Sequence, residues 1–357
     1  MGDAATPSAT VPGASAAAVR PDHSSLTIRE ATPGDADRIL ELVRLSLGEG
    51  SVPRDATFWS WKHRVNPFGE SPILLAESDG LLVGLRAFLR WEWRRGGRTY
   101  RAVRAVDTAT HPDFHGQGIF SRLTLRLVEQ MRDEGVSFVF NTPNSKSGPG
   151  YIKMGWRSLG RTSLWVRPLR LRLSARRDAS MDGKAGDAVT GDSVDRVLNR
   201  AGLHEWLAAL PGDPAHFRTP RTIEYLRWRY AAVPGIPYGA DADMRDGGAA
   251  VVHRLKARGR RCELRICELL VGQGRGARGV ARRLLREACA RSGADFASAM
   301  APFSTAEASV LLASGFIPVP RLGPVLTIRP LAASEDEIRA LLRRSSWGAT
   351  IGDLEVF

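Results

Sequence analysis

The chain has 357 residues, of which 43% are hydrophobic and 25% charged, and it carries a formal net charge of +13. This length exceeds one ordinary domain and suits two domains of about 150 residues each, while the composition excludes a fibrous or wholly disordered chain. No apolar run reaches the roughly 18 residues that span a bilayer, so we expect no membrane partner.

The three cysteines, Cys262, Cys267 and Cys289, fit neither a disulfide framework nor a metal site. The N-terminus lacks the basic and apolar segments of a secretory signal, so we expect a reduced, cytoplasmic protein without metal. Lys and Arg number 51 against 38 acidic residues, but they are spread along the chain. We therefore expect no nucleic-acid partner, and a homo-oligomer stays open.

The first predicted elements are a tail, a strand and a helix. Residues 1–25 are rich in Ala, Ser, Pro and Thr and bury too little apolar surface to order, so we expect a disordered tail. A strand begins at Leu26, and a helix follows the turn at Thr32–Asp35. Three further strands with glycine turns are predicted over 73–77, 82–89 and 99–110.

One long helix dominates the middle of the chain. Residues 118–132 carry an amphipathic apolar stripe that ends before Gly135. Residues 136–141 predict another strand, and a short helix is expected before Gly155. Weak periodicity after that predicts a linker over 169–198.

The second half of the chain repeats the first. Four segments recur at an offset of about 160 residues. The matched residues are Trp61 with Trp228, Arg104 with Arg265, Gly118 with Gly279, and Gly155 with Gly315. Because chance matches would not keep one offset, we predict two copies of one α/β unit with a mixed sheet, over 26–168 and 199–331.

A separate tail is predicted over 332–357. Ser334 and Glu337 have capping-box spacing, which indicates a short helix. The apolar and aromatic residues that follow predict a docked C-terminus.

The clearest chemical signal is the glycine-containing loop that follows His111-Pro112. A helix begins near Gly118, so main-chain N–H groups and the positive helix end point at an anion. Glycines let phosphate oxygens approach the main chain closely. The loop is neither a Walker loop nor a Rossmann fingerprint, and a plain tight turn is the alternative.

This loop resembles the pyrophosphate motif of the Gcn5-related N-acetyltransferase (GNAT) superfamily, Arg/Gln-x-x-Gly-x-Gly/Ala. The matching residues are His115, Gly116, Gln117, Gly118, Ile119 and Phe120. The resemblance implies that they bind acetyl-CoA or another acyl-CoA. His115 stands where Arg or Gln is usual, and Phe120 replaces a small residue.

A second GNAT motif is an Asn, a Tyr seven residues later, and then a Gly-aromatic pair. Here these residues are Asn144, Tyr151, Gly155 and Trp156. The resemblance implies that Asn144 holds the pantetheine arm and that Tyr151 protonates the departing CoA thiolate. The alternative for Tyr151 is a half-buried packing role.

Acyl transfer also needs an oxyanion site and a base. Attack on a thioester builds an oxyanion, which N–H groups at Thr108, Ala109 and Thr110 are expected to hold. An alkyl amine with a pKa of about 10 must first lose a proton. Asp107 is the first candidate base, and a salt bridge with arginine is its alternative role.

Two GNAT-like units followed by a C-terminal segment resemble the enhanced-intracellular-survival acetyltransferases. In that family the terminal carboxylate serves as base, which implies the same role for the carboxylate of Phe357.

The second copy keeps Gly276 and Gly279 but has Leu311 in place of the tyrosine. We therefore predict an α/β protein with two tandem GNAT-like domains, the second degenerate, although a second CoA site is the alternative.

The function implied by these resemblances is N-acyl transfer, most often acetyl transfer, from acyl-CoA to a small-molecule or peptide amine by direct attack in a ternary complex. The alternatives are a non-catalytic acyl-CoA-binding protein and an aminoacyl-tRNA-dependent transferase.

Overall fold

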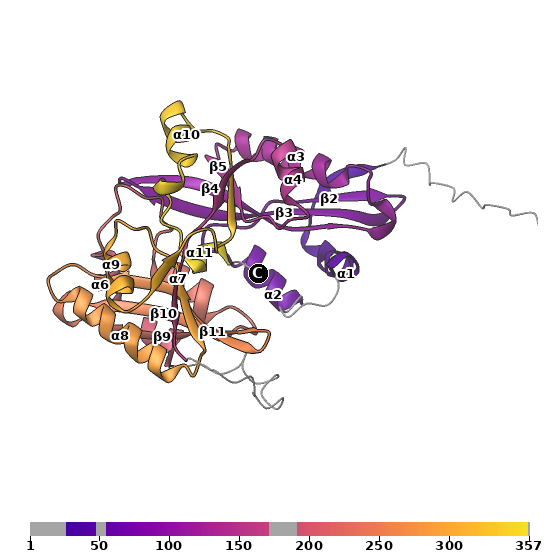
Figure 1. Ribbon diagram of the computed structural model, residues 1–357. Coiled ribbons are helices and arrows are strands. Elements are labelled where there is room, and N and C mark those ends of the chain that lie inside the picture. The colour runs from indigo at the N-terminus through magenta and orange to yellow at the C-terminus, as the bar shows by residue number, and fades with distance from the viewer. Residues whose placement is uncertain (1–25, 48–54, 171–190, 356–357) are drawn as a thin grey trace, which may run out of the picture.

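The computed structural model describes residues 26–47, 55–170 and 191–355, which form two units, each built on a seven-stranded sheet (Figure 1). The predicted disordered tail, 1–25, lies outside these residues. Sheet A contains, in spatial order, β1 (Thr27–Glu30), β2 (Ile73–Ser78), β3 (Leu81–Arg95), β4 (Arg98–Thr110), β5 (Phe138–Asn141), β14 (Val325–Pro330) and β6 (Arg157–Arg161). Sheet B contains β13 (Ile317–Val319), β7 (Leu164–Pro168), β12 (Phe296–Ala299), β11 (Arg261–Val271), β10 (Ala249–Arg258), β9 (Gly239–Asp243) and β8 (Asp192–Ser193).

Both sheets are mixed in the same way. The pairs β4–β5 and β11–β12 are parallel, and all other neighbouring strands are antiparallel. The predicted α/β fold with two related units is confirmed.

Two tight turns fix the register of the first sheet. Gly96 and Gly97 have φ of +56° and +78°, and Asp79 and Gly80 have φ of +49° and +79°. Positive φ at both central residues is typical of two-residue type I′ turns, whose twist matches that of the flanking strands. The glycines predicted as turns therefore form the hairpins.

Helices cover both faces of each sheet. The helices are α1 (Ala36–Leu47), α2 (Ala56–His63), α3 (Ile119–Asp133), α4 (Gly148–Lys153), α5 (Val194–Leu198), α6 (Leu203–Ala208), α7 (Ile223–Leu226), α8 (Ala277–Arg291), α9 (Ala306–Ala313), α10 (Glu335–Leu341) and α11 (Ile351–Leu354). One-turn helical segments lie at Pro33–Asp35, Pro112–Phe114, Arg245–Gly247 and Arg344–Ser346, and a π-helical turn at Arg227–Ala231 continues α7. In the described ranges, no helix has both the length and the apolarity to cross a membrane.

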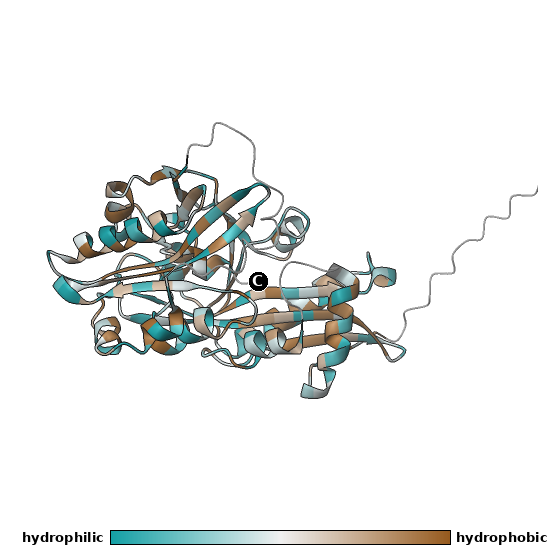
Figure 2. Ribbon diagram, turned by 90° about the horizontal axis from the view of Figure 1, so that it is seen from below, coloured by the Kyte–Doolittle hydropathy of each residue, from teal (hydrophilic) through white to brown (hydrophobic). Residues whose placement is uncertain are grey.

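Alternation along β2 separates the two helical layers of sheet A. Leu74 and Ala76 pack with α3, whereas Leu75 packs with α1. Successive strand residues point to opposite faces, so α1 and α3 lie on opposite sides of the sheet. The helices carry both hydrophilic and hydrophobic residues, as expected for helices with one buried face (Figure 2).

The two halves exchange one strand each. β7 inserts between β12 and β13 of sheet B, and β14 inserts between β5 and β6 of sheet A. Neither predicted unit, 26–168 or 199–331, therefore closes its own sheet. Residues 192–198, predicted as linker, instead form β8 and α5.

The junction between the units has a two-fold character. Trp61 Nε1 donates to the carbonyl oxygen of Trp228 at 2.7 Å, and Trp228 Nε1 donates to that of Trp61 at 2.9 Å. Their rings stack with centroids 5.2 Å apart. Because these tryptophans are a matched pair of the repeat, each copy presents the same element to the other, and a core cluster with residues from both halves surrounds them.

The C-terminal residues dock between the sheets through buried charges. α11 lies between the two units (Figure 1). Arg104 of β4 donates to the carbonyls of Asp353 and Leu354. Arg221 pairs with Glu268 at 2.8 Å and with Asp353 at 3.0 Å. These bonds tie residues 350–355 to both sheets.

Glu355 supplies a pH-dependent part of this docking. Burial raises the pKa of its carboxyl, but Arg265, Arg254 and Lys256 outweigh that effect and lower the pKa to about 2. A carboxyl whose folded pKa is depressed stabilises the folded state above its unfolded pKa, and that stability is lost as pH falls through the folded value.

We expect docking of residues 351–355 to weaken between about pH 4.5 and pH 2. Hydrogen exchange of these amides against pH measures it, and Glu355→Gln should remove this part of the pH dependence. Equal pH dependence in wild type and variant would contradict the assignment to Glu355.

Candidate functional site

One edge of β4 is not covered by a neighbouring strand beyond the short stretch where β4 pairs with β5. The two strands pair only from Ala102 to Arg104, opposite Phe138 to Phe140. β4 continues to Thr110 and pairs there with β3 alone. Main-chain groups on the other edge of this stretch therefore face no described strand, and the predicted Thr108, Ala109 and Thr110 all lie on it.

Asp107 marks a bulge on this open stretch. The β3–β4 register passes from Arg86 opposite Thr108 to Ala87 opposite Val106, so Asp107 has no strand partner. Its φ of +22° is uncommon for a residue with a side chain. Bulges and such backbone outliers concentrate at functional sites, where they redirect a side chain.

Two side chains of α2 bind the Asp107 carboxylate. Lys62 Nζ lies 2.7 Å from Oδ2, and His63 Nε2 lies 2.9 Å from the same oxygen. Burial raises the pKa of Asp107, but Lys62 and His63 outweigh it and hold the pKa well below its usual range. The carboxyl is therefore an anion, and its ion-pair partner is Lys62 rather than an arginine.

Lys62 and His63 were missed as site residues in the sequence, where their segment registered only as part of the repeat. His63 is fully buried, and burial lowers its pKa, so the ring is neutral at neutral pH. Its Nδ1 lies 2.9 Å from Ser71 Oγ. The sequence signal for this cluster was a Lys-His pair beside the repeat residue Trp61, and the helix that carries it was not predicted.

The glycine loop is open where an anion would approach it. Gly116 and Gly118 have φ of +80° and +74°, and a Cβ added at either would meet nothing within 4 Å. Gly118 is the N-cap of α3 and provides no side-chain cap. The first N–H groups of a 15-residue helix thus lack an internal partner and favour a bound anion.

His115 is tied to the end of β4. Its Nε2 lies 3.0 Å from the carbonyl oxygen of Thr110. Since a carbonyl can only accept, Nε2 carries hydrogen, and Nδ1 would donate to a phosphate only in the imidazolium form. The predicted contact of His115 with a phosphate therefore requires the imidazolium form of the ring.

Tyr151 and Phe120 lie together beneath the loop. Tyr151 is buried in α4, and its hydroxyl oxygen accepts a hydrogen bond from Arg86 Nη2 at 2.7 Å. The Phe120 and Tyr151 rings meet edge to face with centroids 5.5 Å apart. A Cβ at Gly150 would lie 3.2 Å from Phe120, so this glycine makes room for the large ring.

Asn144 caps the turn before α4. Its Oδ1 accepts from the N–H groups of Lys146 at 3.0 Å and Ser147 at 2.9 Å. The oxygen is therefore committed to the backbone, and the exposed amide group offers its N–H donors to a ligand. Ile119, at the start of α3, is buried in the core rather than facing the loop.

The loop before α8 in the second unit is crowded, and Gly276 rather than Gly279, the sequence match of Gly118, is the N-cap of that helix. A Cβ at Gly276 would lie 2.5 Å from the Cβ of Asp246, and one at Gly272 would lie 1.8 Å from the carbonyl oxygen of Gly247. Trp206 Nε1 holds that carbonyl at 2.8 Å. Leu311, in the position of Tyr151, is fully buried. The degenerate second copy stays a prediction, which the crowded Gly272 and Gly276 and the leucine in place of the tyrosine support.

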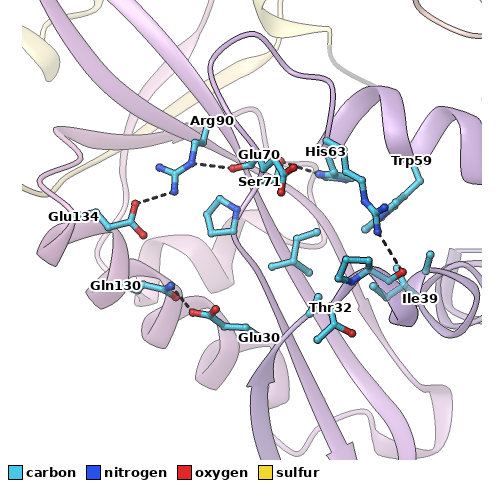
Figure 3. A pocket seen from close by; sticks show the side chains of 16 residues that line it. Glu30, Thr32, Ile39, Trp59, His63, Glu70, Ser71, Arg90, Gln130 and Glu134 are labelled. Atoms are coloured by element: carbon cyan, nitrogen blue, oxygen red, sulfur yellow. Dashed lines mark hydrogen bonds and ion pairs between the residues drawn. The ribbon is translucent and has the colours of Figure 1, made fainter.

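A cavity of about 350 Å³ lies beside the cluster around Asp107, and Trp59, His63 and Ser71 are among the residues that line it (Figure 3). Phe357, the predicted alternative base, lies outside the described residues. Within the described ranges, no cluster of His, Cys, Asp or Glu side chains is arranged to hold a metal ion.

Comparisons with known proteins agree with this geometry. Residues 27–159 match the family model of the GNAT acetyltransferase domain. A GCN5-related N-acetyltransferase from Anabaena variabilis has a TM-score of 0.60 at 12% identity, over 86% of this chain and 73% of that chain. A probable N-acyltransferase of unknown function from Enterococcus faecalis has a TM-score of 0.57 at 12% identity, over 87% and 73%.

A third similar structure is Eis1 from Mycobacterium abscessus, with a TM-score of 0.51 at 13% identity, over 89% of this chain and 76% of that chain. At these identities the likeness shows the fold, including its two-unit extent. No curated protein matches the chain in sequence.

Proposed function

We propose that this chain, whose N-terminal unit belongs to the GNAT acetyltransferases, transfers an acyl group from acyl-CoA to an amine. The observation that carries the proposal is the contrast between its two loops. Gly116 and Gly118 leave open space at the start of α3, whereas Gly272 and Gly276 are covered by neighbouring backbone. One anion site of the kind that binds a pyrophosphate is thus available, in the unit that also contains Tyr151.

The residues of this unit divide the binding of acyl-CoA among them. The N-terminus of α3 offers N–H groups and a positive dipole end to the pyrophosphate. The unpaired edge of β4 offers main-chain groups to the amide-containing pantetheine arm, beside the amide of Asn144. Holding the thioester and the amine together supplies much of the rate.

The chemical step then follows in a ternary complex. The amine nitrogen attacks the thioester carbon, and N–H groups at Thr108 to Thr110 hold the developing oxyanion. The C–S bond breaks, and the thiolate takes a proton from the Tyr151 hydroxyl. The amine proton passes to a base, for which Asp107 and the carboxylate of Phe357 remain the candidates. The acceptor is a small-molecule or peptide amine.

Calorimetric titration with acetyl-CoA and longer acyl-CoAs tests the binding part. We expect one site per chain with a Kd of about 1 µM to 1 mM. Gly118→Glu should abolish the heat, because it places a carboxylate at the phosphate position and a side chain at positive φ.

Gly279→Glu is the control, because Gly279 has open space for a Cβ and lies in the first turn of α8, the corresponding helix of the second unit. It should bind as wild type does. Two sites per chain would show that the second unit also binds. The absence of binding to every acyl-CoA would reject the proposal and favour the aminoacyl-tRNA-dependent alternative.

A further inference from the structure

Arg86 is a buried cation without a buried anion. It lies on β3, and its side chain is fully inaccessible. Within the described ranges, no carboxylate lies at ion-pair distance from its guanidinium, and its Nε has no hydrogen-bond partner. Burial of an unpaired charge is costly, so a fold that keeps one usually uses it.

The surroundings of Arg86 direct it at one hydroxyl group. Nη2 donates to the Tyr151 oxygen at 2.7 Å, and Nη1 donates to the carbonyl of Val106, beside the Asp107 bulge, at 3.2 Å. The guanidinium also lies over the rings of Phe88, Phe120 and Tyr151, at 5.0, 5.6 and 5.4 Å from their centroids. These contacts fix its position relative to both β4 and α4.

This arrangement determines what Tyr151 can do with its hydrogen. An oxygen that accepts from a guanidinium turns its own O–H bond away from that donor. If the hydroxyl gives up its proton, the resulting phenolate lies in contact with a cation in a region of low dielectric, where the attraction is strong. The missing anion of Arg86 would then be the phenolate itself.

We propose that Arg86 is a positioning residue, which orients the Tyr151 hydroxyl and stabilises the phenolate formed when Tyr151 protonates the CoA thiolate. The inference rests on the proposed acyl transfer. In the step concerned, the C–S bond breaks, the O–H bond of Tyr151 breaks, and an S–H bond forms. The phenolate is later reprotonated from solvent.

The size of the effect follows from ordinary acidities. A phenol with a pKa near 10 gives its proton to a thiolate whose acid has a pKa near 8.5 with an equilibrium disfavoured about 30-fold. We therefore expect Arg86→Met to lower kcat by about 30-fold, with a much smaller change in the Kd for acyl-CoA.

Two further variants separate charge from hydrogen bonding. Arg86→Gln keeps an N–H donor without charge and should lose nearly as much kcat as Arg86→Met. Arg86→Lys keeps the cation and should retain kcat within about threefold of wild type.

A double-mutant cycle with Tyr151→Phe provides the decisive readout. In the Tyr151→Phe background, Arg86→Met should change kcat by no more than about twofold, because the phenolate that it serves is absent. Thermal melts and acyl-CoA binding establish that each variant is folded.

An equal loss of kcat from Arg86→Met in both backgrounds would overturn the inference, because a merely structural role persists without the hydroxyl. A folded Arg86→Lys variant that binds acyl-CoA yet loses as much kcat as Arg86→Met would also overturn it. Wild-type protein that binds acyl-CoA without turning it over for any amine would instead reject the proposed function.

Discussion

Replacing Tyr151 by Phe is expected to lower kcat for acyl transfer by about 10²-fold or more, since positioned general acids contribute about 10² to 10⁴. The hydroxyl oxygen accepts a hydrogen bond from Arg86, which Phe would remove. The ring packs against Phe120 and Trp156, and Phe preserves that packing. The Kd for acyl-CoA should therefore stay within about twofold of wild type.

Steady-state release of free CoA thiol, followed with a thiol-reactive dye, measures this effect. Tyr100→Phe is a matched control, because Tyr100 is also a buried tyrosine of sheet A and packs on Phe217 away from α4. A Tyr151→Phe enzyme with wild-type kcat would mean that water or another group protonates the thiolate.

Replacing Arg221 by Met is expected to lower the free energy of unfolding by about 3 to 5 kcal/mol, as breaking a buried ion pair does. Arg221 is the shared partner of Glu268 and Asp353, whose side chains are both fully buried. Without Arg221, two buried carboxylates lie near each other without their shared cation, which destabilises the folded state.

Chemical denaturation with an unchanged m value measures the loss. Arg38→Met is the control, since Arg38 is partly exposed and pairs with Glu77 at the surface, where a pair contributes about 0 to 1 kcal/mol. Neutralising the carboxylates as well, with Glu268→Gln and Asp353→Asn, should recover much of the stability. A loss below 1 kcal/mol for Arg221→Met would show that other groups compensate the two charges.

The glycine loop and the helix after it could be read from the sequence because their signals are local. Gly118 is needed for a positive φ at the N-cap, and the apolar stripe of α3 is buried as its spacing predicts. Tyr151 was found because Asn144, Tyr151, Gly155 and Trp156 resemble a GNAT motif. The structure packs its ring against Phe120 in the first turn of α3, and its catalytic role remains a prediction.

The strand exchange could not be predicted from the sequence, because hydrophobic alternation identifies a strand but does not specify which strand it pairs with. β7 (Leu-Trp-Val-Arg-Pro) and β14 (Val-Leu-Thr-Ile-Arg-Pro) end in similar sequences and would suit either sheet. Arg86 was missed for a related reason. It is one polar residue within an apolar run, and only tertiary packing shows that it is buried.

The sequence match of Arg104 with Arg265 also pairs Asp107 with Glu268, but these two residues are not equivalent in the backbone. In sheet B the unpaired residue is Cys267, and Glu268 lies opposite Val252. The repeat therefore identified corresponding strands, but it could not locate the bulges, because an inserted backbone residue leaves no mark in a pattern of residue types.

The exchanged strand β14 also sets the order in which the protein can mature during translation. Thr327 of β14 bonds to Asn141 of β5, a residue made 186 positions earlier. At about 5 to 20 residues per second, the ribosome needs about 10 to 40 s to supply that partner. During this interval the strand edges of β5 and β6 that later pair with β14 lack that partner and can pair wrongly with other strands. The sheet of the unit with the open glycine loop, although encoded first, is thus completed only after every strand of sheet B has been made.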